Sequence, residues 1–306
     1  METKVRIWPA AVMMFAAALT ASAGMIDLTT AGATAGPVNG AFFEQKTFDT
    51  STGNYVVNGG TIGLGGASIT GNTVGSFTGT VALIVNGAGA QTINGGAYPS
   101  GTFTINKASG EAALGGNLIL IGAGQDLAVA QGVFSLAGYN LTVPDQLTVA
   151  SGAELKLKGN ETISYSGFTP ASGSIIRYYD AAQMATMSKL ATTIPAGVQL
   201  HFGASKTHVY THGVTYTYPC DLYSDGTSST RSVLISNSGT EQYFWTSTGT
   251  NYFDDKINVT DCDASGGNLV WAIGSIGGTQ NNINWKFSIG GGRGGLRGMK
   301  PISNLG

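Results

Sequence analysis

A group of acidic and amide side chains near the C-terminal end offers the clearest candidate for chemistry in this chain. Asp261, Asp263 and Asn268 fall within one glycine-bearing stretch, DCDASGGN, and Asp254 and Asp255 lie just upstream. Carboxylate, amide and carbonyl oxygens are the ligands that calcium prefers. Asp261, Asp263 and Asn268 are therefore candidate calcium ligands, although an ordinary turn is the favoured interpretation. DASGGN is also a good turn sequence, and the fixed ligand positions of an EF-hand loop are absent, so an ordinary turn competes with the calcium site.

The three histidines of the chain, His201, His208 and His212, lie close together in the sequence. On a strand, His208 and His212 would point to the same face, as two zinc ligands do. Zinc needs three or four convergent ligands, and no Asp or Glu lies between His201 and His212. Exposed polar positions on a strand rich in Tyr and Thr are the simpler explanation.

The sequence gives little support for a catalytic site built from charged residues. A glycosidase needs two carboxyl groups about 5 to 9 Å apart, which no spacing in this sequence establishes. A polysaccharide lyase site needs acids and bases clustered on one face, and here the bases could come only from the second half of the chain: Arg177, Lys189, Lys206 and Arg231. We therefore predict that the chain is not an enzyme, and we assign it no catalytic or cofactor-binding residues.

The two cysteines, Cys220 and Cys262, are an even number, which fits a disulfide if the chain is exported. A disulfide requires Cα atoms about 4.4 to 6.8 Å apart. Neighbouring units of a repeat structure meet that distance, whereas units two apart do not. Whether the two cysteines pair stays open at this stage.

The composition excludes strongly electrostatic functions. Charged residues make up 10% of the 306 positions, against about 25% in an ordinary soluble domain, and 47 positions are Gly. Between residues 51 and 150 the charged side chains are Lys107, Glu111, Asp126 and Asp145. With a net charge of −2, such a chain does not attract nucleic acid.

Short apolar segments recur through most of the chain. Between residues 105 and 163 they read LILI, LAVA, FSL, LTV, LTV and LKL, about six to ten residues apart, each too short for a helix. Three such segments make a unit of about 20 to 25 residues, the period of a solenoid whose coils stack on one another. The pattern predicts an all-β chain built as a parallel β-helix. An antiparallel sandwich is the alternative, but many segments are too short for its strands.

The N-terminus has the features of a secretory signal peptide over residues 1–23. Lys4 and Arg6 precede an apolar stretch at 10–21, and small residues at 21 and 23 place a cleavage site between Ala23 and Gly24. A membrane anchor is the competing interpretation, but about 20 apolar residues are needed to cross a bilayer. We expect a secreted protein of the cell surface or the extracellular space, with no stable transmembrane segment.

The remaining chain divides by composition and periodicity. Asp180 as an N-cap, followed by Met184, Met187 and Leu190 at helical spacing, predicts a short helix where the repeats break. We expect the following segments: an N-terminal cap at 24–50, β-helix repeats at 51–168, an insertion with that helix at 169–198, a second β-helix block at 199–289, and a flexible Gly/Arg tail at 290–306.

Several stretches resemble the repeat units of bacterial secreted right-handed β-helix proteins, including adhesin-like surface proteins. They are INKASG, LGGNLIL, GVFSLAGYNLTV and LTVASGAELKLKGNETI, followed by GVQLHFGASKTHVYTHGVTYTY and a closing INWKF strand. The resemblance implies a right-handed β-helix and a structural or adhesive role at a cell surface or in the extracellular matrix.

The partners expected for such a protein are copies of itself, in a homo-oligomer, filament or layer, and cell-surface or extracellular glycans, with no nucleic acid. A virion spike or decoration subunit is one alternative function. A carbohydrate-binding or polysaccharide-degrading β-helix protein is the other.

Overall fold

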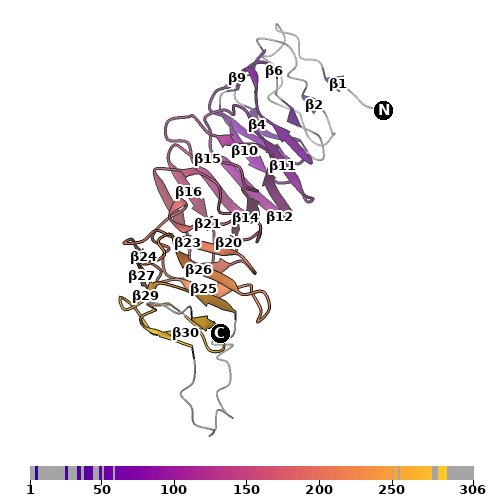
Figure 1. Cartoon of the computed structure of the whole chain (residues 1–306). Coiled ribbons are helices and arrows are strands. Elements are labelled where there is room, and N and C mark those ends of the chain that lie inside the picture. The colour runs from indigo at the N-terminus through magenta and orange to yellow at the C-terminus, as the bar shows by residue number, and fades with distance from the viewer. Residues whose placement is uncertain are drawn as a thin grey trace.

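The strands of this chain stack in parallel into a long solenoid (Figure 1). The structure, a computed structural model, describes residues 4–5, 25–26, 33–35, 38–43, 48–49, 52–57, 59–249, 251–253, 256–277 and 282–287. Within these ranges no helix is long and apolar enough to cross a membrane. Apart from β1 (Lys4–Val5), the predicted leader lies outside the described residues, as do the Ala23–Gly24 cleavage site and the 290–306 tail.

Each coil of the chain lays strands on three faces, which we call A, B and C in chain order. Face A holds β4 (Val38–Phe43), β7 (Gly60–Leu64), β10 (Ala82–Val85), β16 (Gln146–Val149), β19 (Gly167–Pro170), β24 (Thr215–Thr217), β27 (Tyr243–Thr246) and β29 (Cys262–Asp263). Face B holds β5 (Phe48–Asp49), β8 (Ser68–Thr70), β11 (Gln91–Asn94), β17 (Glu154–Leu157), β20 (Ile175–Tyr178), β22 (Gln199–Phe202), β25 (Asp221–Ser224), β30 (Val270–Trp271) and β32 (Trp285–Lys286).

Two long strands, β12 (Phe103–Leu114) and β14 (Leu127–Ser135), bend around the corner from face A to face B. Face C holds β3 (Ala33–Ala35), β6 (Thr52–Val57), β9 (Val74–Thr78), β13 (Leu118–Ile119), β15 (Leu141–Thr142), β18 (Ile163–Ser164), β21 (Ala185–Thr186), β23 (Thr207–Tyr210), β26 (Ser232–Ser236), β28 (Ile257–Val259) and β31 (Ile276–Gly277). The remaining strand, β2 (Met25–Ile26), pairs in parallel with β1.

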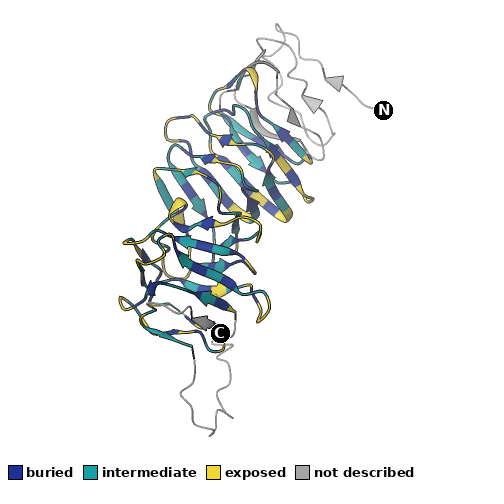
Figure 2. Ribbon diagram, viewed as in Figure 1, coloured by how far each residue is buried: buried dark blue, intermediate teal, exposed yellow. Residues whose placement is uncertain are grey.

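The predicted parallel solenoid and its period are confirmed. Leu83 pairs with Phe103, and Ile176 with Leu200, which sets coils of 20 and 24 residues. Buried residues alternate with less buried ones along strands such as β17, β20 and β22, and Figure 2 shows the same banding of burial along the ribbon. Because the register preserves this alternation from coil to coil, inward residues of successive coils form one continuous core, which is largely aliphatic up to Leu200 and rich in aromatic rings from Phe202 onward.

Strands from the segment expected to be an N-terminal cap extend the same ladders. β3, β4 and β5 pair in parallel with β6, β7 and β8 respectively. These three pairings add a coil to the stack. The segment therefore contributes to the repeats as well as preceding them.

The short helix predicted around residues 180–192 is wrong. The ladder β17–β20–β22–β25 runs through this region without interruption, and only a three-residue 3-10 helix, η2 (Met187–Lys189), occurs there. Asp180 has a left-handed backbone (φ 67°), which a helix N-cap does not adopt. Met184, one of the three residues at helical spacing, is 64% exposed, while Ala185 pairs with His208 of the next coil. In this segment, strand pairing with the next coil is formed in place of the helix that the local spacing predicts.

Buried glutamines close two different corners of the coil with the same pattern of hydrogen bonds. Gln91 accepts from the backbone N–H of Gly87 and donates to the carbonyls of Leu64 and Gly66 on the preceding coil. Gln125 makes the same set of bonds with Gly122, Pro99 and Gly101. These amides satisfy backbone groups that the turns would otherwise leave buried without partners.

Two glycines separate the effect of backbone angle from the effect of close packing between coils. Gly132 (φ 77°) and Gly152 (φ 75°) share a left-handed conformation that disfavours other residues. A Cβ on Gly132 would lie 2.4 Å from the carbonyl oxygen of Lys107, whereas one on Gly152 would meet nothing within 4 Å.

We expect Gly152→Ala to lower the free energy of unfolding by about 1 kcal/mol and Gly132→Ala by about 2 to 3 kcal/mol, because only the latter adds a backbone clash. Urea unfolding of the two variants measures the difference. Equal losses would show that coils are not packed this closely at Gly132.

Candidate functional site on face B

The outer surface of face B carries columns of polar side chains, one residue from each coil. The central column contains Lys156, Arg177, His201 and Tyr223, each paired in register with the next, and it starts from Ser135, which is itself fully buried. Their alternate neighbours, such as Leu155 and Leu200, point into the core. The solenoid thus aligns side chains that are 21 to 24 residues apart in the sequence at the strand spacing of about 4.8 Å.

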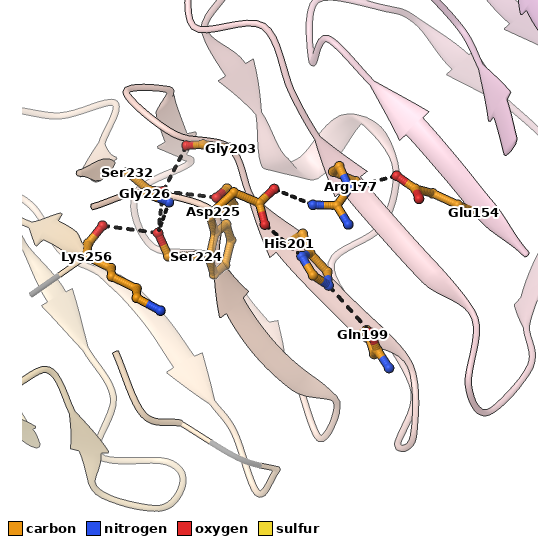
Figure 3. Close-up of polar contacts among 11 residues, drawn as sticks. Glu154, Arg177, Gln199, His201, Gly203, Ser224, Asp225, Gly226, Ser232 and Lys256 are labelled. Carbon is orange, nitrogen blue, oxygen red and sulfur yellow. Dashed lines mark hydrogen bonds and ion pairs between the residues drawn. The ribbon is translucent and has the colours of Figure 1, made fainter. Parts of the chain in front are cut away.

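Arg177 is the centre of a polar network that crosses several coils (Figure 3). Its Nε donates to Oε1 of Glu154 at 2.7 Å, and its Nη1 donates to Oδ2 of Asp225. The other oxygen of Asp225 lies 2.9 Å from Nδ1 of His201, whose Nε2 lies 3.5 Å from Oε1 of Gln199. Side-chain exposures of 13 to 31% leave these groups at the surface but partly shielded from water.

The position of Asp225 is fixed by the loop that follows β25. Its backbone N–H donates to the carbonyl of Phe202 on the preceding coil. Next to it, the Ser224 hydroxyl accepts from Gly226, contacts the Ser232 hydroxyl at 2.7 Å and donates to the carbonyl of Lys256 (Figure 3). Because this loop is tied to coils on both sides, the carboxylate is held in place rather than free to rotate away.

The charge state of Asp225 follows from opposing influences. Burial by itself would raise the pKa of this carboxyl, but hydrogen bonds from His201 and Arg177 outweigh it, so the pKa lies below its ordinary value. Asp225 is therefore a carboxylate at neutral pH. Glu154 and Asp225 together bracket the Arg177 guanidinium in a fixed planar arrangement.

Further ion pairs lie beside this network. Lys156 contacts Glu111 at 2.6 Å across two coils, and its amine lies 4.7 Å from the centre of the Tyr179 ring. Lys158 and Asp180 pair at 3.2 Å at the corner where face B ends. The ion pairs of Lys156, Lys158 and Arg177 all lie on face B or at this corner.

The Asp225–His201 pair has two of the three parts of a hydrolase triad. Nδ1 of His201 contacts the carboxylate, so Nε2 would be the catalytic base. In the part of the chain that the structure describes, Nε2 contacts Gln199 and no hydroxyl, while the Ser224 and Ser232 hydroxyls bond one another and backbone carbonyls. A hollow of about 490 Å³, lined by His212, Gly213, Thr240, Glu241, Gln242 and Phe244, includes none of the network. The geometry suits recognition at an open surface.

The predicted calcium ligands occupy a turn with hydrogen bonds of its own. Oδ1 of Asp263 accepts from the Ser265 N–H, and the Asn268 amide donates to the carbonyl of Thr248. Asp261 is 4% exposed, with a left-handed backbone (φ 57°). Within the described residues no three His, Cys, Asp or Glu side chains are grouped to hold a metal, and Asp254 and Asp255 lie outside those residues.

The three histidines take separate positions. His201 belongs to the network on face B, and His212 pairs with Glu241 at 3.1 Å at an exposed turn. His208 is fully buried, so the expectation that it occupies an exposed polar position is wrong. Its ring packs edge-on against Tyr178 and Phe202, and neither ring nitrogen has a hydrogen-bond partner. An imidazole ring can fill an inward site because its carbon edges are apolar.

His208 makes the fold sensitive to mild acid. Burial, followed by repulsion from the Lys206 ammonium, holds the pKa of His208 well below its ordinary value, although Asp225 opposes this. Below about pH 6.5 the His208 imidazole is protonated in the unfolded chain but stays neutral in the folded chain. His208 therefore lowers the free energy of unfolding by about 1.4 kcal/mol for each pH unit below that value.

We expect His208→Leu to remove that loss between pH 6.5 and 5, and we expect His212→Gln to retain the wild-type slope. Urea unfolding at a series of pH values checks this. A slope that is unchanged in His208→Leu would show that this residue is not the source.

The two cysteines are buried, free and too distant to pair in this fold. Cys220 follows β24 and Cys262 lies in β29, with β27 between these strands in one sheet. The two coils are therefore about 9.6 Å apart, beyond the reach of a disulfide. Burial raises the pKa of Cys220 to about 12, so its thiol is unreactive at neutral pH.

The basic residues considered for a lyase site do not come together. Arg177 lies in the network, but Lys206 is fully buried and Lys189 donates to the carbonyl of Asn160 at an exposed corner. Arg231 lies in the loop before β26. Sequence reasoning missed Glu154 and Asp225 as partners of Arg177, and His201 as a partner of Asp225. For Glu154, Arg177 and His201 the signal is the alternation within ELKL, IIRY and QLHF, which becomes informative once the register of the coils is known. Asp225 lies in the loop after β25, outside any such segment.

Comparisons with protein-family models, with curated proteins and with solved structures found no match to this chain. The resemblance to secreted β-helix proteins is therefore supported at the level of the solenoid fold alone.

Proposed function

We propose that this chain is an exported structural or adhesive protein of a cell surface or extracellular matrix, built on a right-handed β-helix. Face B is its contact surface. The leader-like segment before Gly24 supports export, and the resemblance of the repeats to secreted β-helix proteins supports the handedness and the role. Self-association into a filament or layer is compatible with parallel coils, because a strand edge left uncovered at the end of a solenoid can pair with another copy.

The observation that carries this proposal is the organisation of charge on face B. In a chain with 10% charged residues, the ion pairs of Lys156, Lys158 and Arg177 lie along one open side of the solenoid. Exposed salt bridges contribute little to stability, about 0 to 1 kcal/mol each, so folding alone does not explain their concentration. A rigid array of planar charged and amide groups suits specific contact with another molecule.

Catalysis is supported less well. Glu154 and Asp225 both pair with Arg177, and Asp225 also pairs with His201. Both carboxylates of the network are therefore already held in ion pairs within the protein. A general acid needs a raised pKa, whereas that of Asp225 is lowered. These features favour binding over bond cleavage.

Export is tested by the N-terminus of the protein recovered outside the producing cell. Mass spectrometry of the full-length gene product is expected to give a mature chain that begins at Gly24. A chain that begins at Met1 and remains inside the cell, or is found only in virus particles, would contradict the proposal and favour the virion alternative.

Adhesion is tested with beads coated with the mature chain. We expect a cell monolayer, a biofilm matrix or a layer of the same protein to retain these beads above albumin-coated beads. Retention at the albumin level on all three surfaces would refute an adhesive role.

A further inference from the structure

The outer column of face B changes character toward the C-terminal end, where it becomes aromatic. Tyr223, Tyr252 and Trp271 are 39%, 56% and 43% exposed, and we call these three residues the aromatic row. Tyr252 pairs with Trp271 across a parallel bridge. Gly249 packs against Cys220, and Tyr252 and Tyr223 each follow three residues later on their coils, which places them at matching positions.

The aromatic row joins the polar network at His201. The rings of His201 and Tyr223 stack with centroids 4.8 Å apart and an angle of 20° between their planes. Through His201 the row continues to Asp225 and Arg177. Successive coils therefore present aromatic rings about 4.8 Å apart and then a patch of carboxylate, guanidinium and amide groups.

The core does not require these exposed rings. Leu222, Val270 and Ala272, the inward neighbours of Tyr223 and Trp271, are buried and fill the interior. Outward positions elsewhere on the solenoid carry Thr, Ser and Asn without difficulty, as in β16, β23 and β28. A row of large, half-exposed rings on a rigid face is the kind of surface that marks a binding site.

We propose that the aromatic row and the adjoining network bind a neutral polysaccharide, which lies across the coils of face B. Aromatic rings pack against the C–H faces of sugar rings, and planar polar side chains bond the hydroxyl groups that surround them. The spacing of the coils is comparable with the length of one hexose unit, so an extended chain can meet a ring on each coil. The inference rests on the proposal that face B is the contact surface.

Charge decides between neutral and acidic polysaccharides. Along the row and the network, Glu111, Glu154, Asp221 and Asp225 provide four carboxylates against the side chains of Lys156, Arg177 and Lys286 and the imidazole of His201. This surface has no excess of positive charge. It repels uronates and sulfates, whereas the hydroxyl groups of a neutral glycan can bond both the acidic and the basic groups.

The test is affinity electrophoresis of the full chain in gels that contain hydroxyethylcellulose, glucomannan, xylan or polygalacturonate. We expect at least one of the three neutral polymers to retard the wild-type protein and polygalacturonate to leave its mobility unchanged. The variant Tyr252→Ala/Trp271→Ala should weaken binding at least about tenfold, as loss of aromatic anchors does. The matched control, Tyr139→Ala/Phe244→Ala, removes two rings of 40% and 38% exposure away from face B and should bind as wild type.

Three results would overturn the inference. They are no retardation by any neutral polymer, equal retardation of the wild type and the aromatic-row variant, or a preference for polygalacturonate. Sedimentation of the same variants adds a fourth: a row variant that dissociates an oligomer without affecting retardation would make the row a contact between copies. Because bead retention is measured separately, retention without glycan binding would refute this inference and leave the proposed adhesive role standing.

Discussion

Replacing Trp245 with alanine is expected to lower the free energy of unfolding by about 3 to 5 kcal/mol, among the largest effects of any single change in this chain. Trp245 is fully buried in β27. Its ring lies 5.7 Å from Tyr210, 5.7 Å from Tyr218 and 5.4 Å from Trp285, measured between centroids. These residues come from successive coils, so the loss would leave a cavity that several coils share.

The matched control is Trp271→Ala, which removes the same side chain from an exposed position on face B. We expect a change within about 0.5 kcal/mol for that variant. Urea denaturation followed by far-UV circular dichroism gives both values. If the two variants lose equal stability, the inward position of Trp245 or the outward position of Trp271 is wrong.

The second large effect is expected at Lys206, a buried lysine that joins three successive coils. Its amine donates to the carbonyls of Lys158, Asp180 and Gln183, with 3.1 Å to that of Asp180. Burial lowers the pKa of this amine to about 8. Lys206→Met keeps the apolar stem but leaves three carbonyls without their donor, and we expect a loss of about 3 kcal/mol or more.

Lys189→Met is the appropriate comparison, because the Lys189 amine makes a single hydrogen bond at an exposed position. That variant should retain wild-type stability within about 0.5 kcal/mol. Thermal unfolding of the two variants under one buffer condition provides the measurement. Near-wild-type stability of Lys206→Met would mean that the amine does not organise this corner.

Lys206 also explains why the helix predicted from the sequence at residues 180–192 does not form. The carbonyls of Asp180 and Gln183, which a helix would use in its own ladder, accept instead from a lysine one coil further along. Of the three apolar residues at helical spacing, Met187 and Leu190 are buried and Met184 is exposed. What local spacing could not reveal is that their partners lie on neighbouring coils.

The fold was predictable because the repeats encode it locally. Alternation within segments such as ELKL and QLHF gives inward and outward faces, and the recurrence of segments gives the coil length. Coil lengths vary, from 15 residues between Val270 and Trp285 to 29 residues between Thr215 and Phe244, so errors in register accumulate. For this reason the sequence predicted the solenoid but not which outward residues align.

The candidate site depends wholly on that alignment. Glu154, Arg177, His201 and Asp225 are separated by 23 or 24 residues and belong to different coils, so no motif connects them. The acidic turn at Asp261 attracted attention because its residues are adjacent in the sequence. In the structure, the adjacent residues around Asp261 form a turn, whereas residues of different coils that share a register form the network around Arg177.

The most direct test of the central claim is hydroxyl-radical footprinting of the mature chain while it is attached to the surface that retains its beads. If face B is the contact surface, His201, Tyr223, Tyr252 and Trp271 should be protected several-fold relative to the free protein. Tyr139 and Phe244, exposed to a similar degree away from face B, should react at unchanged rates. Protection of Tyr139 and Phe244 without protection of the face B residues would contradict the account.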